Sequence, residues 1–180
     1  MAVKTITFGL GEASLNRAIR ELKEYEEEVK RNVAELVKRL TETGVTVAIT
    51  RIAMLGAVDT GELSDSIDGY YSAETQTGFI RANAYYAFFV EYGTGIRGTK
   101  HPGDAEWAPP PVSVTVNGKA YGPYTQHDTN GHGEDGWYYI SERDGKRHWT
   151  KGMPSRPFMY ETYKELEGMC ERIYQEVFNG

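Results

Sequence analysis

One stretch near the start of the chain predicts a long helix, SLNRAIRELKEYEEEVKRNVAELVKRLTET (residues 14–43). Its apolar side chains recur three or four positions apart while charges fill the opposite face, as in an amphipathic helix. Ser14 is placed to cap its first turn. A seven-residue spacing also admits a coiled coil, but the run is short, so we expect the helix to lie across its own domain. The residues at this spacing are Leu15, Leu22, Val29 and Leu36.

Two further helical segments are expected on either side of the middle of the chain. Gly44 interrupts the first pattern, which resumes up to Gly56 as a second helix or a bent continuation. At the other end, residues 156–178 predict a closing helix, with Ser155 as its cap and Pro157 in its first turn. The apolar stripe of this helix contains the single cysteine, Cys170, which we expect to be a buried thiol.

Between the helices the sequence changes to short β-prone segments. Residues 59–67 (DTGELSDSI) predict a tight turn and a short helix, capped by Asp59 or Thr60. Residues 70–73 and 79–84 predict two antiparallel strands. Residues 85–92 (YYAFFVEY) are apolar almost throughout and fit a buried strand or a short helix equally well.

Residues 93–155 are rich in glycine, proline and aromatic side chains, and they predict two hairpins. One turns at Asn117-Gly118 and the other at Asp144-Gly145, pairs that accept the positive φ angles of two-residue turns. The fold predicted from the whole pattern is α+β. In it, a long N-terminal helix and a C-terminal helix pack on a small antiparallel sheet, with an extended β-hairpin and loop arm. We expect one domain over residues 1–180, with its core at 14–95 and 137–180 and an inserted arm at 96–136.

The composition narrows the class of protein. A chain of 180 residues has the size of one ordinary domain, and 39% hydrophobic with 26% charged residues is typical of a soluble globular protein. No apolar run approaches the roughly 20 residues that span a bilayer, and the first ten residues lack secretory features, so we expect a cytoplasmic protein. A net charge of −6 disfavours tight binding to nucleic acid, while 13 tyrosines favour contacts between subunits.

The candidate catalytic and metal-binding groups are weak. A zinc site needs three or four ligands on a rigid frame, whereas the histidine-rich cluster lies in a glycine-rich loop and is better explained as solvated; the cluster is His127, Asp128, His132 and Asp135. Asp59-Thr60-Gly61 matches the triplet of aspartic proteases, but that mechanism needs two carboxylates, which here would require a symmetric dimer. We expect no enzyme activity, no metal and no cofactor.

Three separated motifs, in this order, carry a family resemblance. The first is AVDTGEL at residues 57–63 with Ser66-Ile67, the second is AYYAFFVEYGT at 84–94, and the third is KGM at 151–153 with RPFM at 156–159. Together they resemble the phage neck and tail-completion proteins, the gene-product-ten-like family of siphophages. The resemblance covers most of the chain from Ser14 onward, and residues 96–136 look like an insertion relative to that family.

The resemblance implies a structural virion protein, a subunit of a sixfold ring at the head–tail junction that contacts the connector and the tail terminator or tail tube. The ring would be a homo-oligomer assembled in the host cytoplasm, and genomic DNA would pass through it without specific binding. The motif residues would hold the fold or contact neighbouring subunits, and Glu91, if buried, would need a partner such as Arg81, Arg97 or a residue of the next subunit. These motif residues are Asp59, Thr60, Gly61, Leu63, Tyr85, Ala87, Glu91, Tyr92, Gly93, Thr94, Pro157 and Phe158.

Other functions stay open on the sequence alone. Within the structural class, the chain fits a minor capsid or head-closure protein, or a component of a phage-derived tail-like particle. Outside that class, the histidine cluster admits a metal-dependent hydrolase, and a local basic patch admits an adaptor that binds DNA directly.

Overall fold

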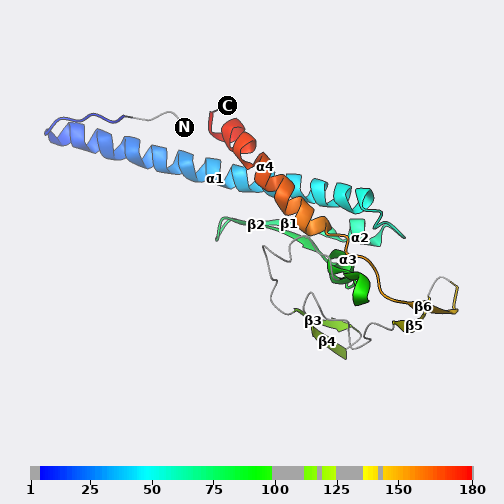
Figure 1. Cartoon of the computed structure of the whole chain (residues 1–180). Helices are drawn as coiled ribbons and strands as arrows, with labels where there is room; N and C mark the ends of the chain where they lie inside the picture. Colours follow the sequence, from blue (N-terminus) through cyan, green and yellow to red (C-terminus); the bar gives the residue numbers. More distant parts are fainter. Residues whose placement is uncertain (1–4, 99–111, 117–118, 125–135, 142–143, 180) are drawn as a thin grey trace. The chain divides into compact units, whose positions relative to one another are not determined.

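The computed structural model describes the chain apart from residues 1–4, 99–111, 117–118, 125–135, 142–143 and 180. It has the mixed helix and sheet content of the predicted α+β class, and Figure 1 shows the elements along the chain. The helices are α1 (Glu12–Met54), α2 (Glu62–Asp65), α3 (Ala87–Tyr92), the 3-10 helix η1 (Gly95–Gly98) and α4 (Phe158–Asn179). The strands form three two-stranded sheets, β1 (Ile67–Ser72) with β2 (Thr77–Ala82), β3 (Val112–Val116) with β4 (Lys119–Tyr124), and β5 (Trp137–Ile140) with β6 (Arg147–Thr150).

Contacts within the chain group its residues into two compact units. The first contains Met1–Val45, Gly69–Ile80 and Glu165–Gly180, and the second contains Thr46–Asp68 and Arg81–Lys164. The chain enters each unit more than once, so both are built from residues far apart in the sequence. The prediction of a single domain with an inserted arm at 96–136 stays a prediction, because much of that segment lies outside the described residues.

Of the two alternatives predicted at Gly44, a separate second helix is wrong, because α1 continues through Gly44 as one helix of 43 residues. Gly44 is buried, and a Cβ atom there would overlap the end of the Ile80 side chain and would lie 2.9 Å from Cδ1 of Leu166. The glycine therefore allows strand β2 and helix α4 to approach α1 closely. Gly69 on β1 has a similar role, since a Cβ there would lie 2.7 Å from Cγ2 of Val45.

The prediction that Ser14 caps α1 is also wrong. The helix begins at Glu12, and the Leu15 N–H donates to the Gly11 carbonyl oxygen, which places Gly11 at the start of the first turn. The Ser14 hydroxyl instead accepts a hydrogen bond of 2.9 Å from the Gly9 N–H. Ser14 thus ties the segment that precedes the helix to its first turn.

Helix α4 buries only part of the predicted stripe, which comprises Met159, Tyr163, Leu166, Cys170, Ile173 and Val177. Its buried side chains are Phe158, Thr162 and Ile173, whereas Tyr163 and Cys170 are exposed. Cys170 thus lies at the edge of the buried stripe, and the expectation of a buried thiol is wrong. Spacing of three and four alone gave the period of the stripe but not its centre.

The second unit has an aliphatic and aromatic core. Leu63 of α2 and Phe158 of α4 are almost completely buried, and further buried residues of this unit lie on α1 and α3. Residues 85–92, which fitted a strand or a helix, contain the helix α3. The other buried side chains of this unit are Val47, Ala48, Ile52, Ile67, Ala87, Val90, Glu91, Tyr92 and Thr162.

Both predicted hairpins form, but the second turns differently from the prediction. In the first hairpin Val116 pairs with Lys119, while the predicted turn residues Asn117 and Gly118 lie outside the described residues. In the second, Ile140 pairs with Arg147, and the Ser141 N–H donates to the Lys146 carbonyl oxygen at 2.9 Å. Asp144-Gly145 is therefore part of a longer turn, in which Gly145 takes a φ of 66°.

Candidate functional site

The second and third sequence motifs are joined in the second unit by the carboxylate of Glu91, and residues of all three motifs line one groove. Glu91 lies on α3 and is only 5% exposed. Its Oε2 accepts a hydrogen bond of 2.8 Å from the Met159 N–H, and its Oε1 accepts one of 3.0 Å from the Tyr160 N–H. The first N–H groups of a helix lack partners within the helix, so Glu91 caps α4 from another part of the chain.

This arrangement corrects the sequence-based capping of α4 and gives Glu91 a partner that was not considered. The helix begins at Phe158, so Pro157 precedes it, and Ser155 lies too far upstream to cap it. The Ser155 hydroxyl donates instead to the Glu91 carbonyl oxygen at 2.6 Å. Of the two arginines proposed as partners for Glu91, Arg81 pairs with Asp68 at 3.4 Å, and Arg97 has an exposed side chain.

The chain immediately before α4 is joined to the chain after α3 by further backbone hydrogen bonds. Thr94 and Met153 exchange N–H to carbonyl bonds of 2.9 and 3.1 Å, and the Met153 N–H also lies 3.0 Å from Oγ1 of Thr94. The Arg156 N–H donates to the Val90 carbonyl oxygen at 2.8 Å. The second and third motifs are therefore held together along their backbones as well as through the Glu91 carboxylate.

Two glycines make this close approach possible. Gly93 has a φ of 73° and Gly152 a φ of 102°, a left-handed conformation that other residues rarely adopt. A Cβ at Gly152 would overlap the carbonyl oxygen of Thr94, and a Cβ at Gly93 would lie 2.6 Å from the backbone nitrogen of Ser155. No side chain fits between the two backbones at these points.

The first motif forms the turn before α2, and its capping differs from the prediction. Gly61, with a φ of 90°, is the cap residue of α2, so Asp59 lies two positions upstream of the capping position. The Thr60 hydroxyl accepts a hydrogen bond of 3.3 Å from the Glu62 N–H, which is a local turn bond, and no side chain caps α2. The side chains of Asp59, Thr60 and Glu62 are exposed, whereas Leu63 anchors the turn in the core.

This turn and the other two motifs line one groove, which we call the turn groove. Its volume is about 520 Å³. Gly56 to Ser64 form one side, Tyr85, Tyr86, Phe89 and Val90 come from the second motif and α3, and Met153 and Arg156 come from the chain before α4. The lining of the groove therefore combines aromatic rings with the carboxylates of Asp59 and Glu62.

The groove contains one tyrosine with a perturbed hydroxyl. Burial raises the pKa of Tyr86, and the negative charge of Glu62 and of Asp59 adds to this, while a hydrogen bond with the backbone of Leu63 opposes it. A tyrosine with a raised pKa stays protonated and is a poor nucleophile or base at neutral pH.

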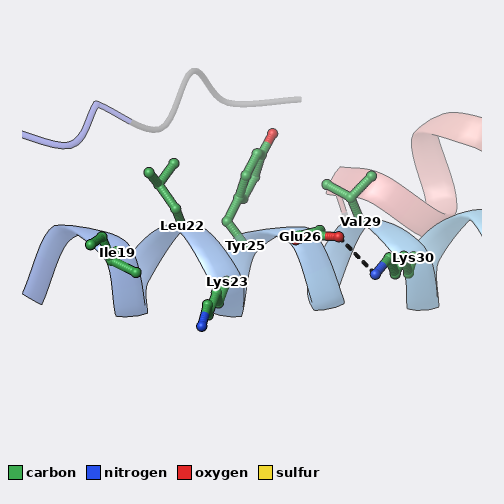
Figure 2. A pocket seen from close by; sticks show the side chains of 7 residues that line it. All are labelled: Ile19, Leu22, Lys23, Tyr25, Glu26, Val29 and Lys30. Carbon is green, nitrogen blue, oxygen red and sulfur yellow. Dashed lines mark ion pairs between the residues drawn. The ribbon is translucent and has the colours of Figure 1, made fainter. Parts of the chain in front are cut away.

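A second hollow lies on α1, in the first unit. Its volume is about 550 Å³, and its lining is almost entirely apolar (Figure 2). Leu22, Tyr25 and Val29 project from one side of the helix, and a 2.8 Å ion pair joins Glu26 to Lys30. Leu22 is 55% exposed, so this part of α1 presents apolar surface.

The predicted motif residues take three kinds of position, and Gly61, Gly93 and Thr94 are half-buried. Leu63, Ala87, Glu91, Tyr92, Pro157 and Phe158 are buried, whereas Asp59, Thr60 and Tyr85 are exposed at the groove. The contributions of Tyr86 and Gly152 were not predicted individually, although both lie in the quoted motifs, and Ser155 was predicted as a helix cap and not as a partner of Glu91.

The metal hypothesis concerns residues that are not described. His127, Asp128, His132 and Asp135 all lie outside the described part of the chain. Among the residues that the structure does describe, no three His, Cys, Asp or Glu side chains are grouped so that they could hold a metal ion. Within the same residues, no helix is long and apolar enough to cross a membrane.

Comparisons with known proteins add no family assignment. Neither the protein-family models, nor the curated proteins, nor the solved structures gave a significant match to this chain.

Proposed function

We propose that the chain is a structural subunit of a tailed bacteriophage particle, a neck or tail-completion protein that forms a ring where the tail joins the head. One observation carries the proposal. Residues of all three motifs behind the resemblance, which span residues 57–159 of the sequence, line the turn groove, and Glu91 joins the second motif to the third. Motifs that are separate in sequence but share one structural task are better explained by a common fold than by chance matches.

The chemistry of the junction also supports a structural role. The Glu91 carboxylate is buried and bonded to backbone N–H groups, a position that holds a helix in place. The glycines at 93 and 152 fix the path of the backbone without offering a reactive side chain. A rigid junction of this kind suits a subunit that has to keep its shape under load.

Exposed aromatic surface supports assembly with other subunits. On the hairpin β5–β6, Tyr138 is 55% exposed, Ile140 73% and Trp149 50%. Aromatic side chains are enriched at the centres of protein interfaces. A two-stranded hairpin is also marginally stable by itself, so contact with a neighbouring surface would stabilise it.

The proposed partners follow from the place in the particle. They are further copies of the chain, expected to be six, together with the connector and the tail terminator or tail tube. The net charge of −6 suits a channel through which DNA slides, because a basic lumen would bind the phosphates.

Immunogold electron microscopy of intact particles tests this function. Antibodies against the chain are expected to label the head–tail junction, with antibodies against the major head protein as the control for access. Label spread over the head would favour the minor capsid alternative, and label on headless tubes would favour a tail-like particle. Purified particles that lack the chain altogether would refute a structural role in the virion.

A further inference from the structure

The hairpin β5–β6 has one face that combines apolar, aromatic and cationic groups. Tyr138 pairs with Trp149 and Ile140 with Arg147 across the two strands, which places all four side chains on the same face. The rings of Tyr138 and Trp149 lie 4.7 Å apart, and the Arg147 guanidinium lies 4.0 Å from the centre of the Tyr138 ring. These side chains are exposed, so this face, which we call the hairpin face, is not buried within its own chain.

The turn groove has complementary properties. The exposed apolar side chains of Val58 and Tyr85 line it, and Asp59 and Glu62 supply negative charge. The segment from Gly56 to Ser64 contains no basic residue, while the strand β6 and its preceding turn carry Lys146 and Arg147. Arg156, on the other side of the groove, is half-buried and donates its backbone N–H to Val90.

We propose that the hairpin face of one copy docks in the turn groove of the next copy, with Arg147 placed against Glu62 and Asp59. This inference rests on the proposed function, because it names the contact that builds the ring. Complementary charge points to a second copy as the occupant, because the groove carboxylates of Asp59 and Glu62 and the hairpin cations of Lys146 and Arg147 belong to the same chain. The groove also contains Arg156, and the hairpin turn contains Asp144, which pairs with His148. The groove is also of a size suited to side chains, as pockets of about 300–1,000 Å³ take small ligands.

A contact between two different patches of the subunit is of the kind that can build a ring. The two surfaces are different patches of one subunit, so each copy offers one hairpin and one groove to its neighbours. Interfaces of this head-to-tail kind generate rings when the rotation between copies closes, and open filaments when it does not. In a symmetric dimer, by contrast, each hairpin would occupy the partner's groove. Both surfaces of both copies would then be used, and assembly would stop at two.

A charge-swap cycle on the full chain tests the contact. Arg147→Glu is expected to weaken association at least about tenfold in concentration-dependent native mass spectrometry, because it sets two acidic groups against each other. Glu62→Arg alone is expected to weaken association similarly, and the double variant is expected to recover most of the loss. Arg20→Glu, a reversal of the same sign at an exposed position on α1, serves as the control and is expected to assemble normally.

A pair of introduced cysteines tests the same contact between copies by a method that does not depend on charge. In a Cys170→Ser background, Ile140→Cys combined with Val58→Cys is expected to form disulfides between copies on mild oxidation, giving a ladder that ends at the ring. Each single cysteine variant is the matched control, with no product larger than a dimer. Circular dichroism on every variant separates loss of contact from loss of fold.

The outcomes for the two proposals can be told apart. If the unmodified chain forms a ring while Arg147→Glu assembles normally and the cysteine pair stays unlinked, the docking proposal is refuted and the neck function stands. Cross-linking of the hairpin cysteine to a different neck protein, and not to a second copy, also refutes it. If the unmodified chain forms no ring alone or on particles, both proposals are refuted.

Discussion

The Oε2 atom of Glu91 lies 2.8 Å from the backbone nitrogen of Met159, although 68 residues separate the two in the sequence. A side chain on one short helix thus supplies the cap for another helix. The contact joins the second and third motifs, and it accounts for a buried acidic residue in an aromatic segment without any catalytic role.

Replacing Glu91 tests this cap. Glu91→Ala is expected to lower the free energy of unfolding by about 1–3 kcal/mol, because it leaves two buried N–H groups without acceptors. Glu91→Gln keeps one acceptor oxygen and is expected to lose less. Urea denaturation followed by circular dichroism measures both, and Glu24→Ala, at an exposed site on α1, is the control. Equal stability of Glu91→Ala and the unmodified chain would contradict the cap.

The close approach of the backbones at Thr94 and Gly152 gives a second prediction. Gly152→Ala is expected to cost about 3 kcal/mol or more, because its Cβ overlaps a backbone carbonyl that cannot rotate away and its φ of 102° is strained for alanine. Gly145→Ala shares a positive φ of 66° but meets nothing within 4 Å, so a loss of about 1–2 kcal/mol is expected. Thermal unfolding compares the two, and similar losses would mean that the close approach is not present.

Gly44 and Gly168 form a matched pair inside helices, and alanine should affect them with opposite sign. Gly168→Ala meets open space and is expected to stabilise the chain by about 0.5–1 kcal/mol through helix propensity. Gly44→Ala makes the same gain but overlaps the Ile80 side chain, so a net loss of about 1–2 kcal/mol is expected. A stabilising Gly44→Ala, measured by urea denaturation, would show that strand and helix do not pack at this position.

The raised pKa of Tyr86 makes the free energy of unfolding depend on pH in the alkaline range. Its folded pKa is raised above the unfolded value of about 10, so the folded state holds the proton more tightly. The stability gained from this group is complete below pH 10 and is lost as the pH rises through the folded pKa. The difference in unfolding free energy between the unmodified chain and Tyr86→Phe is therefore expected to shrink above about pH 10. A difference that stays constant from pH 8 to pH 11 would rule out the raised pKa.

Several elements could be predicted from local sequence because local chemistry determines them. The amphipathic period of residues 14–43 predicted α1, and the turn pair Asn117-Gly118 predicted the first hairpin. The short helix α2 followed from the polar turn before it. Boundaries were less accurate, since β1 and β2 begin at Ile67 and Thr77, a few residues before their predicted starts.

The errors have a common physical cause, which is contact with residues far away in the sequence. Gly44 reads as a helix breaker locally, but Ile80 and Leu166 pack against it and make its missing side chain an advantage. Residues 85–92 have no period that distinguishes strand from helix, and the core around Leu63 and Phe158 selected the helix. Cys170 shares the period of the buried stripe but lies at its edge.

The sequence by itself determined the α+β class, the long first helix, the hairpins and the order of the three motifs, because propensity, period and turn chemistry act over a few residues. Only the tertiary structure decided that Glu91 caps α4 and that the turn at Asp59 shares a groove with Tyr85 and Arg156. Those relationships depend on which distant segments come within hydrogen-bonding distance, and no local pattern encodes that distance.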